Sequence, residues 1–278
     1  MSYSAIGPGR VAVITGAASG IGLAAARALA ARGMRVAIAD LGADRLEAAR
    51  ALIVAAGAPD VIAAEVDVAD AGALAALAAR VTDHWGGADV VMLNAGIGPD
   101  SAITGPAEVW QRMLAVNLWG VINGAQAFLP GMLARGQDGM IICTGSKQGI
   151  TTPPGNPAYN VAKAGVKVFA EALEHDLRGR EGARISAHLL IPGFVFTGLT
   201  GGLEKPAAAW TAEQTVDFML TALARGDFYI LCPDNDVPRA LDEKRILWAA
   251  GDIVENRPPL SRWHKDHAEA FKALVARG

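Results

Sequence analysis

The chain has few cysteines, few aromatic residues and no excess of charge of one sign. Two of its 278 residues are cysteines, 6% are aromatic, and 25 basic residues oppose 28 acidic ones, for a net charge of −3. This balance gives no electrostatic case for nucleic acid or anionic lipid as a partner. No apolar run reaches the ~18 residues that a membrane span needs, and residues 1–10 show no signal-peptide pattern.

These absences predict a cytoplasmic protein that neither crosses a membrane nor binds nucleic acid. Cys143 and Cys232 both stand in apolar runs, so we expect buried free thiols, with a disulfide or redox switch as the alternative. No metal site is expected. His264 and His267 have helical spacing, but no cysteine or third ligand accompanies them.

What the chain does contain is an alternation of short apolar runs with helical stretches. Its 52% hydrophobic content excludes a disordered polymer. The expected strands are 11–15, 35–40, 61–68, 89–94, 140–144, 184–191 and 228–232. After a first helix behind the glycines at 16–22, the expected helices are 44–56, 71–85, 106–135 with a break near 117, 158–178 and 211–225. Since nearly continuous apolar strands are buried on both faces, this alternation predicts an α/β, doubly wound Rossmann fold. Its seven-stranded, mostly parallel sheet would carry helices on both faces.

No internal repeat or low-complexity linker divides the chain, so we predict a single domain over residues 1–278. Its core would span about 9–232, and residues 233–278 would form a C-terminal extension. Helical spacing recurs in that extension over 242–254 and 267–276. A disordered tail would not need Trp248, Trp263 and Phe271. We therefore expect the extension to pack on its own core or on a neighbouring subunit.

A glycine-rich turn, TGAASGIG at residues 15–22, separates the first strand from the first helix. Glycines permit a tight turn and let main-chain N–H groups approach a pyrophosphate at the helix N-terminus. Asp40 ends the second strand, where a carboxylate can bind the adenosine ribose hydroxyls. Each feature alone has a plainer interpretation, as a connecting turn and as a surface residue.

The order of motifs along residues 9–232 resembles the short-chain dehydrogenase/reductase family. The similarity lies in the TGxxxGxG turn, an acidic-apolar pair at 67–68, an NAG turn at 94–96, the YxxxK pair of Tyr159 and Lys163, and a PG-and-Thr segment ending at Thr197. The resemblance implies that the cofactor-binding residues are Gly16, Ser19, Gly20, Ile21, Gly22, Asp40, Leu41, Asp67, Val68, Asn94, Ala95, Gly96, Tyr159, Lys163, Pro192, Gly193, Val195 and Thr197. The family's VDGG-like ending after the last strand is absent.

Asn117, Ser146, Tyr159 and Lys163 fall where this family has its catalytic tetrad. Lys163 follows Tyr159 by four residues, so both project from one helix face, and the ammonium is expected to lower the pKa of the phenol. Ser146 would donate to the substrate oxygen. The resemblance also implies that Lys163 hydrogen-bonds the nicotinamide ribose. It further implies a helix break at Asn117, whose main chain holds a water that relays protons between Lys163 and solvent. Out of context, such residues are ordinary helix-face, strand-cap and helix-interior residues.

The sequence thus predicts an NAD(P)-dependent alcohol dehydrogenase or ketoreductase, with Tyr159 as general acid/base. NAD is expected over NADP, because Asp40 would repel a 2′-phosphate and Arg35 lies a strand length away. A dinucleotide sensor without turnover is the alternative, and the complete tetrad argues against it. A serine hydrolase would need Gly-x-Ser-x-Gly, whereas residues 145–149 read GSKQG.

The loops 148–157 and 194–209 are expected to choose the substrate. In and directly beside these loops, apolar residues include Ile150, Pro153, Pro154, Phe194, Phe196, Leu199 and Trp210, and the loops contain no arginine. These loops, and the tail that among relatives accompanies bulky substrates, predict an uncharged, apolar secondary alcohol or ketone. The resemblance further implies a homotetramer or homodimer, formed through the long helices 117–135 and 158–178.

Overall fold

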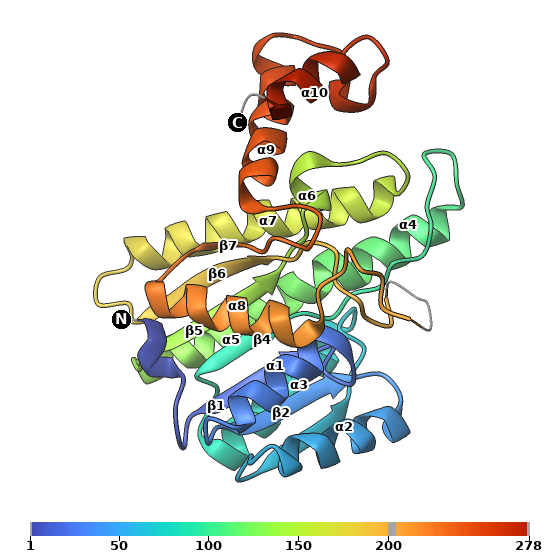
Figure 1. The fold of residues 1–278 in the computed structure, drawn as a ribbon. Coiled ribbons are helices and arrows are strands. Elements are labelled where there is room, and N and C mark those ends of the chain that lie inside the picture. Colours follow the sequence, from blue (N-terminus) through green and yellow to red (C-terminus); the bar gives the residue numbers. More distant parts are fainter. Residues whose placement is uncertain (1, 200–203, 277–278) are drawn as a thin grey trace.

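Seven parallel strands form one sheet at the centre of the molecule (Figure 1). The computed structural model of the chain describes residues 2–199 and 204–276. The strands are β1 (Val11–Thr15), β2 (Arg35–Asp40), β3 (Val61–Glu65), β4 (Val90–Leu93), β5 (Gly139–Thr144), β6 (Ile185–Ile191) and β7 (Tyr229–Leu231). Their order is β3-β2-β1-β4-β5-β6-β7, and every neighbouring pair is parallel. The predicted fold class is therefore confirmed.

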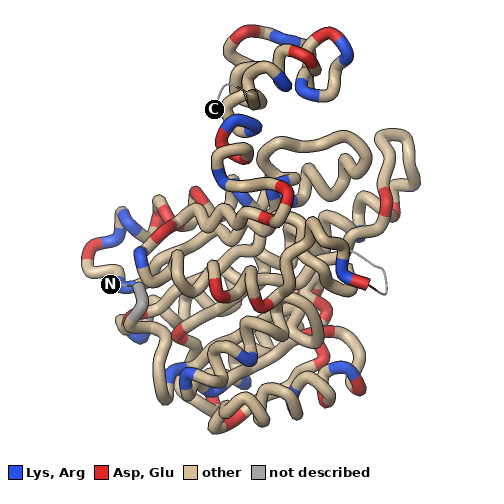
Figure 2. The backbone as a smooth tube through the Cα atoms, in the orientation of Figure 1, with Lys and Arg blue, Asp and Glu red and all other residues tan. Residues whose placement is uncertain are grey.

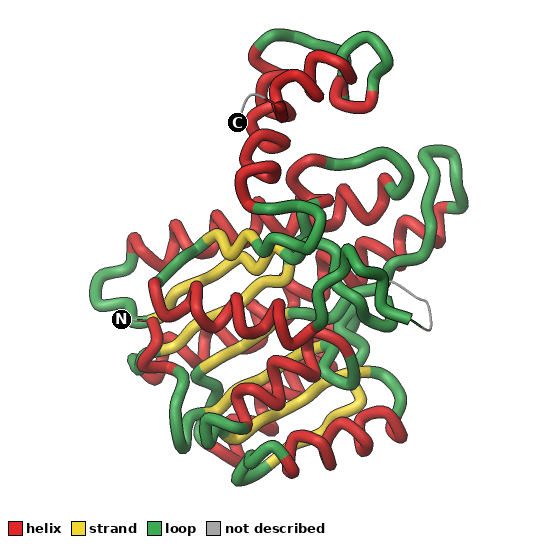
Figure 3. Tube along the Cα trace, in the orientation of Figure 1, coloured by secondary structure: helices red, strands yellow, loops and turns green. Residues whose placement is uncertain are grey.

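Helices cover both faces of this sheet (Figures 1 and 3). One layer consists of α1 (Gly20–Ala30), α2 (Ala43–Ala55) and α8 (Ala212–Arg225), and the other of α3 (Ala71–Trp85), α5 (Gly120–Arg135) and α7 (Pro157–Gly179). Ile14 packs against the first layer and Val13 against the second. Burial on both faces explains why the strands are continuously apolar. It also encloses Cys143 and Cys232, which are buried free thiols as predicted.

The strand order reverses between β1 and β4. The chain runs outward from β1 to β2 and β3, then crosses to the other side of β1 to begin β4. The segments that follow β1 and β4 therefore leave the sheet in opposite directions. A crevice opens at such a point, outside the carboxyl ends of the strands.

Several element boundaries differ from the sequence-based expectation. β3 ends at Glu65, before Val68, because the Asp67 carboxylate accepts the Ala69 N–H at 3.0 Å and turns the chain. The helical stretch expected over 106–135, with a break near 117, consists of α4 (Ala107–Leu114), the π-helical η2 (Ala115–Trp119) and α5, so that the break is confirmed. The short α6 (Gln148–Thr151) and the N-terminal η1 (Ser2–Ala5) were not predicted.

Residues 239–276, which we call the C-terminal arm, project from the body beside α6 (Figure 1). The arm contains α9 (Arg239–Val254), η3 (Ser261–Trp263) and α10 (Ala268–Ala276). Its aromatic side chains pack within the arm itself: the Trp248 and Phe271 rings lie 5.3 Å apart, and Trp248 Nε1 donates to Ser261 Oγ at 2.7 Å. The arm therefore folds as a hairpin of helices that contacts the body at its base.

Along the backbone, Lys and Arg positions are interspersed with Asp and Glu positions rather than gathered by sign (Figure 2). No helix within residues 2–199 and 204–276 has both the length and the apolar character to cross a membrane. Across that same part of the chain, no three His, Cys, Asp or Glu side chains are grouped so as to hold a metal ion.

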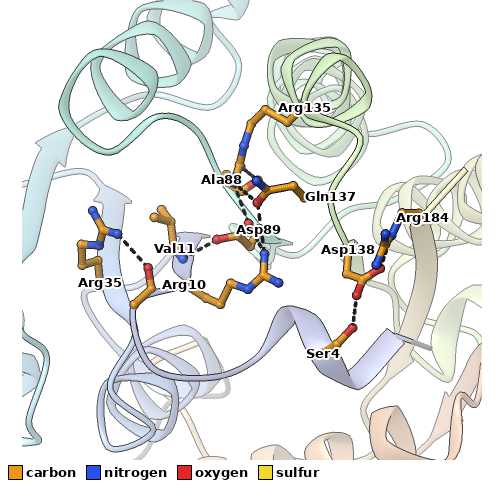
Figure 4. A network of polar contacts seen from close by, with 11 residues as sticks. Ser4, Arg10, Val11, Arg35, Ala88, Asp89, Arg135, Gln137, Asp138 and Arg184 are labelled. Atoms are coloured by element: carbon orange, nitrogen blue, oxygen red, sulfur yellow. Dashed lines mark hydrogen bonds and ion pairs between the residues drawn. The ribbon is translucent and has the colours of Figure 1, made fainter.

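The buried carboxylate of Asp89, just before β4, ties the start of β1 to the end of α5 (Figure 4). Asp89, 3% exposed, accepts the Val11 N–H at 2.8 Å at the start of β1. It also accepts Arg10 at 3.2 Å and Arg135, from the end of α5, at 2.8 Å. The carboxylate therefore fixes where β1 enters the sheet relative to β4 and α5.

Replacing Asp89 by alanine should lower the free energy of unfolding by about 1–3 kcal/mol, because the buried Val11 N–H loses its acceptor. Urea unfolding measures this change. Glu47→Gln is the control, since the Glu47–Arg50 pair is exposed on α2 and its loss should leave the unfolding midpoint unchanged. Equal midpoints for Asp89→Ala and the parent would contradict the assignment.

Candidate active site

A cleft of about 1120 Å³ opens at the carboxyl ends of β1, β2, β4, β5 and β6. Almost all residues predicted for the site line it: Gly16, Ser19, Gly20, Ile21, Asp40, Leu41, Asp67, Val68, Asn94, Ala95, Gly96, Ser146, Tyr159, Lys163, Pro192, Gly193, Val195 and Thr197. Two predicted residues, Gly22 and Asn117, do not line the cleft and stand behind its wall. The crevice at the strand-order reversal is thus the place where the predicted site residues meet.

The glycine turn is held against the end of β4 by main-chain contact. Gly16 has a φ of +66°, and a Cβ there would lie 2.6 Å from the Cα of Ala95. A Cβ on Gly22 would lie 2.2 Å from the Gly16 carbonyl oxygen. Asn94 Nδ2 donates to the Thr15 and Gly16 carbonyls, each at 3.2 Å. Gly22 and Asn94 therefore shape the turn.

The N-terminus of α1 faces the cleft with donors available. The helix begins at Gly20, and Ser19, its N-cap residue, makes no side-chain capping bond to the helix. The first N–H groups of a helix lack intrahelical partners and favour an anion. This end of the cleft therefore suits a phosphate group, and the methyl of Thr197, packed beside Gly20, covers it.

Asp40 closes the next part of the cleft at the end of β2. Its carboxylate accepts the Ala18 and Leu41 N–H groups, both at 2.8 Å. Arg45, from α2, lies 3.9 Å from this carboxylate and 3.4 Å from Ser19 Oγ. No cation was expected near Asp40, but Arg45 is one. It is the third residue of α2, five residues after Asp40, and that position gave no signal in the sequence.

A second unforeseen cation stands near the acidic-apolar pair. Arg112, on α4, forms an ion pair with Asp67 at 2.9 Å, and both side chains line the cleft. Burial raises the pKa of Asp67, but the Ala69 N–H and Arg112 outweigh it, so that this pKa lies below its ordinary value. Asp67 is thus a carboxylate at neutral pH, and its ion pair fixes this wall of the cleft.

Ser146, Tyr159 and Lys163 converge at the other end of the cleft. Ser146 follows β5, whereas Tyr159 and Lys163 lie one turn apart on α7. The Ser146 hydroxyl lies near the Tyr159 phenol, and its influence works to lower the pKa of that phenol. Lys163 is 4% exposed, and its Nζ donates to the Thr144 carbonyl at 2.8 Å and lies 5.7 Å from the centre of the Tyr159 ring.

The electrostatics of this pair differ from the expectation. Burial raises the pKa of Tyr159 above its ordinary value, and the hydrogen bond with Ser146 only partly opposes this. Burial also lowers the pKa of Lys163 to about 8. The prediction that Lys163 lowers the Tyr159 pKa is therefore wrong for the protein chain itself, because desolvation outweighs an ammonium that points at Thr144.

Asn117 joins η2 to the segment that follows β4. It is fully buried; its Oδ1 accepts the Ile97 N–H, and its Nδ2 donates to the Ile97 carbonyl, both at 2.7 Å. A Cβ on Gly96 would lie 3.3 Å from Asn117 Oδ1 and 3.8 Å from Lys163 Nζ. The Asn117 side chain therefore positions the loop beside Lys163, and the predicted helix break is a π-helical turn.

Of the apolar residues expected to contact the substrate, only some line the cleft in the described part of the chain. Phe194 and Leu199 line it and are 40% and 48% exposed. Ile150 and Trp210 instead pack against the hydrophobic core. Positions 200–203 of the expected substrate loop lie outside the described residues.

The residues of the cleft fit a nicotinamide dinucleotide. The uncapped helix N-terminus suits the pyrophosphate, Asp40 suits an adenosine ribose, and Lys163 and Tyr159 stand where the reacting end would lie. These three features follow one another along one continuous cleft.

Comparisons with known proteins agree with this geometry. Residues 10–208 match the model of the short chain dehydrogenase family. The chain is 34% identical to 1-deoxy-11-beta-hydroxypentalenate dehydrogenase from Streptomyces exfoliatus, over 91% of this chain and 94% of that protein.

Two solved structures are similar in fold. A short chain dehydrogenase/reductase from Burkholderia phymatum in complex with NAD has a TM-score of 0.83 and 29% identity, covering 92% of this chain and 97% of that one. An alcohol dehydrogenase from Thermococcus sibiricus complexed with 5-hydroxy-NADP has a TM-score of 0.69 and 29% identity, covering 77% and 90%. The chain belongs to the short-chain dehydrogenase/reductase family of oxidoreductases.

Proposed function

We propose that the protein is an NAD-dependent dehydrogenase or ketoreductase of apolar, bulky secondary alcohols and ketones, with Tyr159 as general acid/base. The observation that carries this proposal is that Ser146, Tyr159 and Lys163 line the same end of the cleft, with Lys163 Nζ 5.7 Å from the centre of the Tyr159 ring. The polar groups of these three side chains meet at one part of the cleft wall, whose other residues are partly polar and partly apolar. A sensor without turnover would have no use for this arrangement.

In this mechanism the protein handles the proton and the alignment of the reactants. The Ser146 hydroxyl donates to the substrate oxygen and holds it beside Tyr159, whose phenolate takes the alcohol proton during oxidation and returns it during reduction. The Lys163 ammonium, which donates to the Thr144 carbonyl beside the tyrosine, would hold the nicotinamide ribose. A nicotinamide bound beside these residues would supply the hydride chemistry.

Because the pKa of Tyr159 is raised, the rates of alcohol oxidation and of ketone reduction should depend on pH in opposite ways. Alcohol oxidation needs the phenolate, so its rate rises as pH increases toward that pKa. Ketone reduction needs the protonated phenol and is favoured at lower pH. Lys163, with a pKa of about 8, loses its charge before Tyr159 ionises, so the oxidation rate should stop rising above about pH 8.

The preference for NAD is supported by Asp40 and opposed by Arg45. The carboxylate would repel a 2′-phosphate at short range. Arg45 is 57% exposed and 3.9 Å from that carboxylate, so solvent weakens its effect. Among the similar solved structures, the one from Burkholderia phymatum is a complex with NAD and the one from Thermococcus sibiricus a complex with 5-hydroxy-NADP. Our proposal of NAD therefore rests on the negative charge of Asp40.

The proposed substrate class rests on the charges of the cleft wall. Its described cations are each engaged: Arg45 is near Asp40, Arg112 pairs with Asp67, Lys163 binds the Thr144 carbonyl, and Lys147 pairs with Asp234 and Asp242. Phe194 and Leu199 offer apolar surface. The name of the Streptomyces exfoliatus relative describes a hydroxylated substrate, which supports a hydroxyl as the reacting group.

We further propose that the protein is a homo-oligomer formed through α7. Val161 and Val168 are seven residues apart, so they share one helix face, and they are 49% and 63% exposed. Trp119, 53% exposed, stands on the neighbouring η2. Large exposed apolar side chains grouped on two adjacent helices are typical of an interface. Dimer and tetramer are both compatible with this face.

Replacing Tyr159 by phenylalanine should lower kcat at least 100-fold, because the acid/base is removed. Cofactor affinity should stay nearly unchanged, since the phosphates and the adenosine ribose are bound elsewhere. Absorbance of the reduced nicotinamide measures turnover, and fluorescence titration measures binding. Tyr229→Phe is the control, because Tyr229 is half exposed on β7 and bonded to Glu171.

If Tyr159→Phe kept more than about a tenth of the parent's kcat, the assignment of the acid/base would be wrong. A parent protein that binds the cofactor and turns over no alcohol or ketone would instead be a sensor. The same assay tests the substrate class: aryl-substituted secondary alcohols should exceed polyols and hydroxy acids in kcat/KM, and the opposite order would refute it.

Replacing Asp40 by asparagine should shift the ratio of kcat/KM values toward NADPH by tenfold or more, because the negative charge that would repel the 2′-phosphate is removed. The amide keeps one oxygen as an acceptor for the main-chain N–H groups. Adding Arg45→Ala to this variant should reverse part of the gain, since Arg45 is the nearby cation. Steady-state kinetics with both cofactors measures the ratio. A parent protein that prefers NADPH would overturn the proposal.

In light scattering, the parent should have a mass at least twice the 28.7 kDa of one chain. Val168→Glu should reduce that mass, because it places a charge within the proposed apolar interface. Leu52→Glu is the matched control, since Leu52 is a similarly exposed leucine on α2. A monomeric parent at micromolar concentration would refute the interface.

A further inference from the structure

A cluster of three charged side chains lies directly beside Ser146. Lys147 Nζ is 3.2 Å from Asp234 Oδ2 and 2.6 Å from Asp242 Oδ2. The three side chains are 15%, 6% and 5% exposed. Lys147 follows β5, Asp234 follows β7, and Asp242 lies in the first turns of α9. The cluster therefore joins the strand that ends at the active site to the C-terminal arm.

The cluster also holds the turn at Pro192 and Gly193. Asp234 Oδ2 accepts the Phe194 N–H at 3.2 Å, and the Lys147 N–H donates to the Pro192 carbonyl at 3.3 Å. A Cβ on Gly193 would lie 2.6 Å from Asp234 Oδ2 and 2.9 Å from Lys147 Nζ. The turn thus rests on the ion pair itself, and a side chain at position 193 would displace it.

The main chain of Lys147 sets the geometry around the serine. The Lys147 carbonyl accepts the Ile150 and Thr151 N–H groups, each at 3.1 Å, and so begins α6. In the same turn the Gln148 N–H donates to Ser146 Oγ at 3.1 Å. A shift of the Lys147 backbone would therefore move the hydroxyl that hydrogen-bonds Tyr159.

Asp242 connects this geometry to the C-terminal arm. Of the residues of α9, all of which the structure describes, Asp242 alone is buried. Its carboxylate meets Lys147, and Arg245 on the same helix lies 4.0 Å from its other oxygen. The fully buried contact between α9 and the active-site segment is therefore an ion pair, and the partly buried Ile246 adds an apolar contact with the hydrophobic core beside it.

A buried ion pair is weak evidence for stability, because desolvation of both charges offsets most of their attraction. Two carboxylates around one ammonium are costlier still, and burial accordingly raises the pKa of Asp242. Such a cluster fixes the positions of its members relative to one another, since a buried charge that moves away from its partner is left uncompensated. The effect of this cluster is therefore to hold Lys147 in place.

We propose that Lys147 is a positioning residue for the reaction: clamped by Asp234 and Asp242, it fixes the Ser146 hydroxyl against Tyr159 and makes that position depend on the base of the C-terminal arm. This inference rests on the proposed function, in which Ser146 aligns the substrate oxygen. Lys147 acts through Ser146 and through the Pro192–Gly193 turn.

Asp242→Asn tests this with the least disturbance, because it keeps the shape of the side chain and leaves the Lys147–Asp234 pair in place. We expect kcat to fall roughly tenfold through misplacement of the serine, with the cofactor dissociation constant unchanged. Lys147→Met should lower kcat by about 100-fold and also lower the melting temperature, since it leaves two carboxylates facing each other. Lys147→Arg should recover part of the loss. Glu243→Gln, which breaks an exposed pair with Arg239 on the same helix, is the matched control and should change nothing.

A second measurement does not depend on turnover. The hydrogen bond with Ser146 lowers the pKa of Tyr159, so loosening that bond should shift the phenolate titration of Tyr159 to higher pH. Ultraviolet absorbance follows this titration, Tyr159→Phe identifies its signal, and Ser146→Ala sets the largest shift to expect. Asp242→Asn should shift it in the same direction by a smaller amount.

The two measurements separate the possible failures. A shifted phenolate titration in Asp242→Asn, in a protein without dehydrogenase activity, would support the positioning role and refute the proposed function. A lower melting temperature with unchanged kcat and unchanged titration would show a purely structural cluster and overturn the proposal. An effect of Glu243→Gln equal to that of Asp242→Asn would overturn it as well.

Discussion

The contact between the β1–α1 turn and the end of β4 leaves no room for a side chain, and the geometry of the cleft depends on it. Any Cβ on Gly16 or Gly22 would meet main-chain atoms at 2.6 Å or less, closer than real contacts allow. Asn94 then bridges the two segments through the Thr15 and Gly16 carbonyls. Because this contact fixes the N-terminus of α1 relative to β4, it sets the distance from the phosphate end of the cleft to Tyr159.

The parts of the site that the sequence could predict are those that depend on main-chain conformation and on the spacing of residues within short segments. A glycine turn after an apolar run, a carboxylate at the end of the next strand and a Tyr–Lys pair one helical turn apart are properties of short segments. Parallel strands then bring their carboxyl ends to one edge without further information. This is why residues as distant as Asp40 and Tyr159 line the same cleft.

What the sequence could not predict are pairings between side chains of distant segments. Arg45 beside Asp40 and Arg112 beside Asp67 depend on how α2 and α4 are rotated against the sheet. Asn117 was assigned through its main chain, whereas its side chain brackets Ile97 from inside a π-helical turn. The length of β3 was overestimated for a related reason, because the Asp67 side chain ends the strand by bonding its own backbone.

The direction of the Tyr159 pKa shows why burial must be weighed before charge. Desolvation moves Tyr159 and Lys163 toward their neutral forms, upward for the phenol and downward for the ammonium, so the pair alone does not produce a phenolate at neutral pH. The opposing contributions come from hydrogen bonds and from positive charge placed at the ring. Ser146 gives the first, and a cationic nicotinamide ring gives the second when it is bound.

The position of the serine then matters more than in a site whose tyrosine is already acidic, because its bond is the contribution that the chain itself makes toward the phenolate. In this protein the strand that carries Ser146 is held at its end by Lys147, and Lys147 by carboxylates from β7 and α9. The C-terminal arm begins where the family's usual ending is absent, and the single residue that α9 buries is one of those carboxylates. An extension joined through an apolar face would change the stability of the body. In the mechanism that we propose, an extension joined in part through a buried ion pair beside Ser146 would, in addition, affect the position of that serine relative to Tyr159.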